Sequence, residues 1–211
     1  MTSLADSMLN LAQSPNILVA CDYDGTISPI VDNPSDAKPN RDCAVAIRLL
    51  AQMPQTHVAI ISGRSLQDLS TLTDFHPAIH LVGSHGSEFD ADFNHRLTDQ
   101  QTSLRRRLEL ELSKIATGDP LLKIEVKPAS VAFHYRKVKP ETASAALTAI
   151  KNGPAKLPGV FLKSGKMVLE LTVIATDKGA ALETMRRRVG ASAVLFIGDD
   201  TTDEDAFKTL Y

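Results

Sequence analysis

The chain has 211 residues, 43% of them hydrophobic, which is enough to bury one large core or a core with an inserted subdomain. Its net charge of −2 and its aromatic content of 5% argue against nucleic acid as a partner, so any anionic ligand must be captured locally. No stretch approaches the ~20 consecutive apolar residues of a membrane span, so no membrane partner is expected.

Short apolar runs alternate with helix-like stretches at both ends of the chain, a pattern typical of a parallel α/β sheet. Strands are predicted at residues 17–21, 57–61, 79–82 and 194–197. Helices are predicted at residues 40–53, with Asn40 as the N-cap, and from Ser65 onward. Because ligand groups gather where parallel strands end, the polar residues that follow these strands should share one crevice.

The middle of the chain follows a different pattern. It predicts a helix, a hairpin-like pair of strands, a second helix and two further strands, at residues 99–118, 121–127, 130–136, 141–151, 159–163 and 167–171. This order is typical of an α+β subdomain. We therefore predict a core formed by residues 1–96 and 172–211 and an inserted cap formed by residues 97–171.

Two carboxylates, Asp22 and Asp24, directly follow the first predicted strand and precede Gly25 and Thr26. Asp22 can act as a nucleophile on a phosphate if a bound Mg²⁺ neutralises both partners. Asp24 could donate a proton to the leaving oxygen and later take one from the attacking water. Thr26 offers a hydroxyl and a backbone N–H to a phosphoryl oxygen. The alternative, a surface Asp-Gly turn, does not account for the adjoining apolar strand or for the motifs below.

A second acidic group follows the last predicted strand and contains Asp199, Asp200 and Asp203. Two acidic strand ends in one parallel sheet suit an oxygen-ligated Mg²⁺ site, although one residue between 201 and 203 is also expected to cap the next helix. Ser62, at the end of the second strand, and Lys178, at the start of a helix, could bind phosphoryl oxygens.

The order Asp-x-Asp-Gly-Thr, Ser-Gly-Arg, Lys, Gly-Asp-Asp-x-x-Asp resembles the four motifs of the haloacid dehalogenase (HAD) superfamily. The resemblance implies a Rossmann-like core with an inserted C2-type cap, and a phosphoaspartate on Asp22. It implies acid and base action by Asp24, and Mg²⁺ held by Asp22, the Asp24 carbonyl and Asp199. Asp200 and Asp203 would be ligands through water or would orient Lys178.

Residues of the predicted cap, together with Ser62-Gly63-Arg64 and Gly83-Ser84-His85-Gly86, resemble the trehalose-6-phosphate phosphatase family. The resemblance implies Mg²⁺-dependent hydrolysis of trehalose 6-phosphate, in trehalose biosynthesis. It places Gly63, Arg64 and His85 on the core side of the sugar-phosphate site, and Glu125, Lys127, Arg136, Lys166 and Glu170 on the cap side. Independently, Glu125 and Lys127 lie two apart on one predicted strand, so their side chains should share a face. The alternative is that these charges form ordinary cross-strand ion pairs on a solvated face.

Several alternative hypotheses about the function remain. Another sugar phosphate, such as sucrose phosphate or glucosylglycerol phosphate, could be the substrate, and a sugar phosphomutase is a more distant possibility. The chain stops at Tyr211, where the superfamily core normally continues with a strand and a helix, so an inactive sugar-phosphate-binding module of a larger synthase-phosphatase is an alternative. Cys21 and Cys43 suit reduced thiols, and residues 1–15 lack the apolar run of a signal peptide, so we expect a cytoplasmic protein; a monomer is compatible with the sequence.

Overall fold

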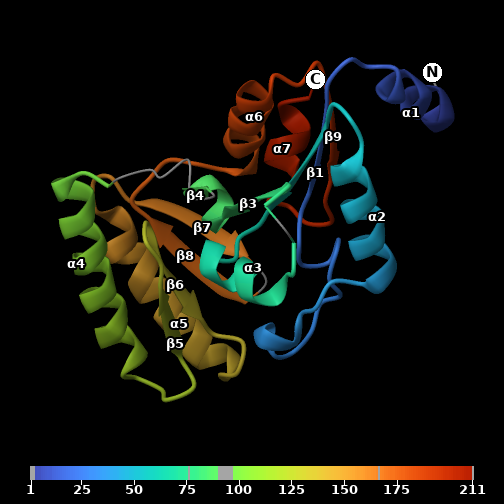
Figure 1. The fold of residues 1–211 in the computed structure, drawn as a ribbon. Coiled ribbons are helices and arrows are strands. Elements are labelled where there is room, and N and C mark those ends of the chain that lie inside the picture. Colours follow the sequence, from blue (N-terminus) through green and yellow to red (C-terminus); the bar gives the residue numbers. More distant parts are fainter. Residues whose placement is uncertain (1–2, 76, 90–96, 166, 211) are drawn as a thin grey trace. The chain divides into compact units, whose positions relative to one another are not determined.

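The computed structural model describes residues 3–75, 77–89, 97–165 and 167–210, and it divides into two compact units (Figure 1). Residues 1–94 and 176–211 form the first, which we call the core unit, and residues 95–175 form the second, which we call the cap unit. The insertion predicted at residues 97–171 lies inside the cap unit.

The core unit is built on a five-stranded sheet in which the strand order is β4-β3-β2-β1-β9. Four strands are parallel, and the short β4 pairs with β3 in the antiparallel sense. The strands are β1 (Ile17–Cys21), β2 (Thr56–Ile61), β3 (Ile79–Gly83), β4 (Glu88–Phe89) and β9 (Ala193–Ile197). Parallel pairing brings the ends of β1, β2 and β9 to one edge of the sheet, where the polar motifs begin.

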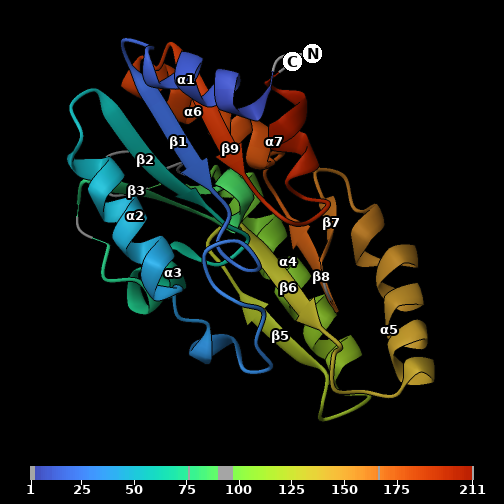
Figure 2. The same ribbon diagram turned by 90° about the vertical axis from the view of Figure 1, so that its right-hand side faces the viewer.

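Helices cover both faces of this sheet (Figure 2). One face packs Leu18 and Ile61 against α6 and α7, and the other packs Val58 and Ile60 against α2 and α3. The sheet is thus buried on both sides, which explains why the sequences of its strands are continuous apolar runs. The helices are α1 (Leu4–Ala12), α2 (Arg41–Gln52), α3 (Leu66–Leu72), α6 (Lys178–Val189) and α7 (Glu204–Lys208), with short 3₁₀ turns at Pro34–Asp36 and Ser84–Gly86.

The cap unit has a four-stranded antiparallel sheet with the order β5-β6-β8-β7. Its elements are α4 (Asp99–Ala116), β5 (Lys123–Val126), β6 (Ser130–His134), α5 (Pro140–Asn152), β7 (Phe161–Gly165) and β8 (Val168–Thr172), with a 3₁₀ turn at Pro154–Lys156. Val131, Phe133 and Leu171 point toward α4 and α5 and form its core with Leu108 and Ile150. Strand alternation therefore sends the intervening polar residues to the opposite face.

The predicted fold class, an α/β core with an inserted α+β subdomain, is confirmed. Asn40 caps α2 as predicted, because its side chain accepts hydrogen bonds from the backbone N–H groups of Asp42 and Cys43. Two elements were not predicted, the N-terminal helix α1 and the two-residue strand β4. None of the helices in the described part of the chain has the length and apolar character needed to cross a bilayer.

Candidate active site

Asp22 directly follows β1 and is 5% exposed. Its backbone N–H donates to the carbonyl of Ile197 on β9 at 2.8 Å, which fixes the start of the loop. Its Oδ1 lies 2.8 Å from Nζ of Lys178. Burial raises the pKa of Asp22 to about 6, and the negative charge of Asp203 adds to this, although Lys178 pulls in the opposite direction. The result is a buried carboxylate whose charge depends on a cation beside it.

Lys178 is the first residue of α6 and is 3% exposed. Asp177 caps this helix by accepting from the N–H of Ala180, which holds the first turn in place. The ammonium lies 2.7 Å from Oδ1 of Asp203 as well as against Asp22. Burial disfavours the charged ammonium, but the two carboxylates outweigh it and raise the pKa of Lys178. Lys178 therefore stays a cation that both carboxylates share.

Asp203 precedes α7 and is fully buried. It occupies the N-cap position, yet its side chain makes no capping bond to this helix. Its Oδ2 accepts instead from the N–H groups of Asp199 and Asp200, at 3.1 and 3.0 Å, while its Oδ1 faces Lys178. Asp203 thus links the Lys178 ammonium to the backbone of the loop after β9.

A carboxylate cluster at the ends of β1 and β9 could hold a metal ion. One oxygen each from Asp22, Asp199 and Asp203 lies within 4.8 Å of the others. Hard oxygen donors of this kind are the ligands that Mg²⁺ takes, so the residues fit the predicted ion. Gly25 is needed beside them, since it has a φ of 93° and a Cβ there would lie 2.2 Å from Oδ2 of Asp199. Asp200 is not among the three clustered carboxylates.

The second carboxylate of the first motif, Asp24, is held by Arg64. Nε and one terminal nitrogen of Arg64 donate to the two oxygens of Asp24, each at 2.7 Å. The other terminal nitrogen donates to the Pro34 carbonyl at 3.0 Å, and the guanidinium lies over the Tyr23 ring at 5.5 Å. Because the planar guanidinium binds both carboxylate oxygens and is itself held by the Pro34 carbonyl, it fixes the direction of the carboxylate. Arg64 was predicted as a sugar ligand, and its contact to Asp24 was not foreseen.

Ser62, Gly63 and His85 lie beside the end of β2. Ser62 is buried, its carbonyl accepts from the N–H of His85 at 2.9 Å, and its hydroxyl accepts from the N–H of Arg64 at 3.2 Å. A Cβ on Gly63 would lie 2.6 Å from Nε2 of His85, so the imidazole lies directly against this glycine. Thr26, also predicted, donates from its hydroxyl to Oδ1 of Asp199 at 3.4 Å.

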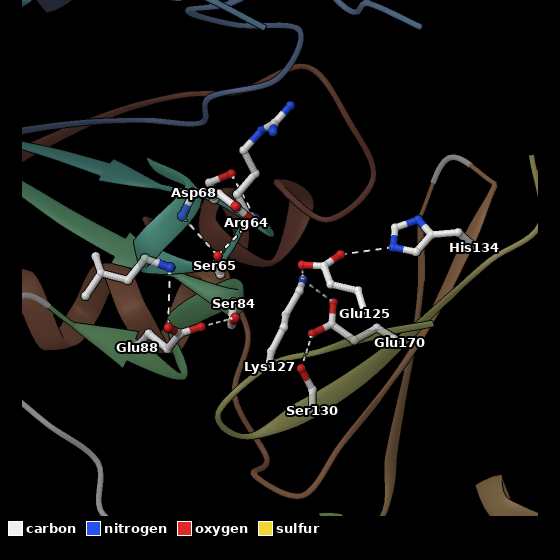
Figure 3. Close-up of polar contacts among 12 residues, drawn as sticks. Arg64, Ser65, Asp68, Ser84, Glu88, Glu125, Lys127, Ser130, His134 and Glu170 are labelled. Atoms are coloured by element: carbon white, nitrogen blue, oxygen red, sulfur yellow. Dashed lines mark hydrogen bonds and ion pairs between the residues drawn. The ribbon is translucent and has the colours of Figure 1, made fainter. Parts of the chain in front are cut away.

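The face of the cap sheet opposite α4 and α5 carries a charged cluster (Figure 3). Nζ of Lys127 lies 3.4 Å from Glu170 and 3.9 Å from Glu125, so the predicted shared face of Glu125 and Lys127 is confirmed. Ser130 donates to the other oxygen of Glu170 at 2.5 Å, and Nε2 of His134 lies 2.9 Å from Glu125. Lys127 and Glu170 are both buried. The cluster thus offers two carboxylates and an ammonium held in a fixed arrangement.

Register explains how this cluster forms. Ala132 on β6 is paired with Glu125 on β5 and with Glu170 on β8, so one small residue separates the two carboxylates. Ser130 and His134 lie two positions to either side of Ala132 and therefore share its face. Neither was proposed as a site residue from the sequence, although cross-strand hydroxyl and imidazole partners of acidic residues are the signal that could have found them.

The remaining two predicted cap residues are Arg136 and Lys166. Arg136 lies in the turn after β6 and is exposed. Lys166 lies outside the described residues.

Comparison with known proteins places the chain in a family. A family model described as trehalose-phosphatase matches residues 20–211. A probable trehalose-phosphate phosphatase H of Arabidopsis thaliana is 30% identical, over 97% of this chain and 64% of that protein. A trehalose-phosphate phosphatase of Mycobacterium marinum is 32% identical, over 100% of this chain and 57% of that protein. The chain thus spans less than two thirds of these curated relatives.

A solved structure agrees with the sequence relatives. The C-terminal domain of a C. albicans trehalose-6-phosphate phosphatase matches with a TM-score of 0.78 and 25% identity, over 96% of this chain and 76% of that one. The likeness extends through both units of the fold.

Proposed function

Because the chain belongs to the trehalose-phosphatase family, we propose that it hydrolyses trehalose 6-phosphate to trehalose and phosphate through a phosphoaspartate on Asp22. The observation that carries this proposal is the buried Asp22 carboxylate, 2.8 Å from the Lys178 ammonium, which Asp203 holds from the other side. This arrangement keeps a nucleophile and a phosphate-binding cation together at the strand end.

In the first half of the reaction, a carboxylate oxygen of Asp22 attacks the phosphorus atom. A new O–P bond forms, the bond between phosphorus and the sugar oxygen breaks, and Asp24 gives a proton to the departing oxygen. In the structure, two hydrogen bonds from Arg64 fix the direction of the Asp24 carboxylate. Freed trehalose then leaves.

In the second half, a water molecule attacks the phosphoaspartate and Asp24 takes a proton from it. The O–P bond to Asp22 breaks, phosphate is released and the Asp22 carboxylate is restored. Lys178, the Ser62 hydroxyl and Thr26 bind phosphoryl oxygens throughout, and they stabilise the charge that grows there. Asp22, Asp199 and the Asp24 carbonyl would hold Mg²⁺, which would neutralise the negative charge on the nucleophile and the phosphate.

The cap unit would recognise the sugar. A sugar hydroxyl both donates and accepts hydrogen bonds, so a face that offers carboxylates beside an ammonium suits it. Glu125 on β5, Lys127 just after it and Glu170 on β8 supply these groups. Arg136 and Lys166 are proposed to add positive charge on the cap side, with Gly63, Arg64 and His85 on the core side.

Phosphate release by the full-length protein in the presence of Mg²⁺ tests this proposal. We expect kcat/KM for trehalose 6-phosphate to exceed that for glucose 6-phosphate, sucrose phosphate and glucosylglycerol phosphate by about 100-fold, which is the value of two or three specific hydrogen bonds. Equal rates on these esters would overturn the sugar assignment. Calorimetric binding of the sugar phosphate without any Mg²⁺-dependent phosphate release would favour a regulatory binding module.

Location and assembly stay predictions. A cytoplasmic protein is expected, with which the two free thiols, Cys21 and Cys43, are compatible. We expect neither nucleic acid nor membrane as a partner, and a monomer is compatible with the proposed reaction.

A further inference from the structure

The loop that carries His85 has an unusual backbone. Ser84 and His85 are consecutive non-glycine residues with φ values of 49° and 52°. Residues other than glycine rarely adopt this left-handed backbone conformation, and they keep it only where neighbouring contacts hold them. Contacts with neighbouring residues must therefore hold the backbone of Ser84 and His85 in this conformation.

Two backbone hydrogen bonds tie this loop to the loop after β2. The N–H of Ser84 donates to the Arg64 carbonyl at 2.7 Å, and the N–H of His85 donates to the Ser62 carbonyl at 2.9 Å. The His85 imidazole is thereby pressed against Gly63, between the serine and the arginine of that motif. The two loops form one surface at the strand ends.

Glu88 joins the same two loops through its side chain (Figure 3). It is the first residue of β4, and its backbone is paired with Gly83 at the end of β3. One carboxylate oxygen accepts from the Ser84 hydroxyl, and the other accepts from the N–H of Leu66, in the first turn of α3, at 3.3 Å. The carboxylate thus connects the left-handed residue next to His85 with the helix that follows Arg64.

We propose that Glu88 is a positioning residue for His85. By holding Ser84 against the start of α3, it keeps the left-handed loop in place and the imidazole against Gly63, on the core side of the sugar-phosphate site. Glu88 would act only through His85 and the loop, and would not touch the substrate. The proposal rests on the proposed function, because it assumes that His85 contacts the sugar phosphate.

Glu88→Gln and a matched control separate this role from simple helix capping. Asp68→Asn is the control, since Asp68 lies in the same first turn of α3 and its side chain pairs with the Ser65 hydroxyl at 2.7 Å. We expect Glu88→Gln to raise KM for trehalose 6-phosphate about tenfold, the value of one well-made hydrogen bond, with kcat within about twofold. Asp68→Asn should leave both constants within about twofold. Equal effects of the two variants would overturn the proposal.

A double variant provides a second kinetic test of whether Glu88 acts through His85. If Glu88 acts through His85, adding Glu88→Gln to His85→Ala should change KM by less than about twofold, because the group being positioned is already gone. Full additivity of the two KM effects would contradict the proposal.

Hydrogen exchange tests the same idea without any turnover. The His85 amide donates to Ser62, so its exchange rate reports whether the loop is held. We expect this amide to exchange at least about tenfold faster in Glu88→Gln than in wild type or Asp68→Asn. An unchanged rate would overturn the proposal. A wild-type protein that releases no phosphate would instead refute the proposed function and leave the exchange result to stand by itself.

Discussion

The two units hold their charged residues in different ways. In the core unit, Asp22 follows β1, Lys178 begins α6 and Asp203 precedes α7, and backbone groups and a buried cation fix them. In the cap unit, Glu125 and Glu170 lie on β5 and β8, on either side of β6, and Lys127 directly follows β5. These three side chains are fixed mainly by one another, with Ser130 and His134. A site tied to the backbone suits chemistry at one atom, and a cluster of side chains on a sheet face suits recognition of several hydroxyls.

This contrast has a kinetic consequence. Changes to Asp22, Lys178 or Asp203 should lower kcat for every phosphate ester, while changes to Glu125, Lys127 or Glu170 should raise KM for the sugar ester alone. p-Nitrophenyl phosphate, which has no sugar, serves as the reference substrate in the tests below.

The largest effect is expected for Asp22→Asn. The amide cannot form the phosphoaspartate, so kcat should fall by at least about 10³-fold on both the sugar phosphate and p-nitrophenyl phosphate. Asp36→Asn, an exposed carboxylate that accepts from Asn33, is the control and should keep wild-type rates. Near wild-type phosphate release by Asp22→Asn would show that the nucleophile is another group.

Lys178→Met should have the next largest effect. It leaves Asp22 and Asp203 buried without their shared cation, which costs about 3–5 kcal/mol of unfolding free energy, and it should lower kcat about 100-fold. Urea unfolding and phosphate release measure the two effects. Lys208→Met, which removes an exposed partner of Asp205, is the control. A Lys178→Met protein as stable and active as the control would refute the role of this lysine.

Glu170→Gln tests the cap side of the contrast. Its neutral amide keeps the shape but weakens the contacts to Lys127 and Ser130, so kcat/KM for trehalose 6-phosphate should fall about 10- to 100-fold. The rate on p-nitrophenyl phosphate should stay within about twofold. Glu109→Gln, on the helix α4, removes the exposed partner of Arg105 and is the control. Parallel losses on both substrates would place Glu170 in the chemistry and break the division between units.

The smallest expected effect is on stability against pH in the metal-free protein. The pKa of Asp22 is raised to about 6 in the folded state, so the folded protein binds a proton more tightly than the unfolded chain. Its contribution to stability is therefore present below about pH 4 and is lost as the pH rises through 6, a change of about 3 kcal/mol at most. Urea unfolding with EDTA should show this change in wild type and not in Asp22→Asn. Parallel curves for the two proteins would contradict the pKa of Asp22.

Much of the core site could be predicted from the sequence because its residues follow apolar strands directly. Asp22, Ser62 and Asp199 lie where those strands end, and parallel pairing brings such ends together whatever the intervening loops do. The cap elements were predicted in the right order, but β7 and β8 each begin later than expected. Alternation alone cannot fix a strand end to better than a few residues.

Partners that depend on register or on a folded loop could not be predicted. The contact of Ser130 with Glu170 follows from the pairing of β6 with β8, which the sequence does not specify. The hydrogen bonds from Arg64 to Asp24, and from the N–H of Leu66 to Glu88, depend on the conformations of the loops after β2 and β3. Short elements such as β4 carry too few residues for a periodic signal.

Trapping of the covalent intermediate tests the central claim most directly. The full-length protein is mixed with trehalose 6-phosphate and Mg²⁺, quenched rapidly in acid during turnover and digested for mass spectrometry. The account predicts one phosphoryl group on the peptide that contains Asp22, formed from trehalose 6-phosphate and far more slowly from glucose 6-phosphate. Release of trehalose with no phosphoryl group found on Asp22, or equal labelling from both esters, would contradict it.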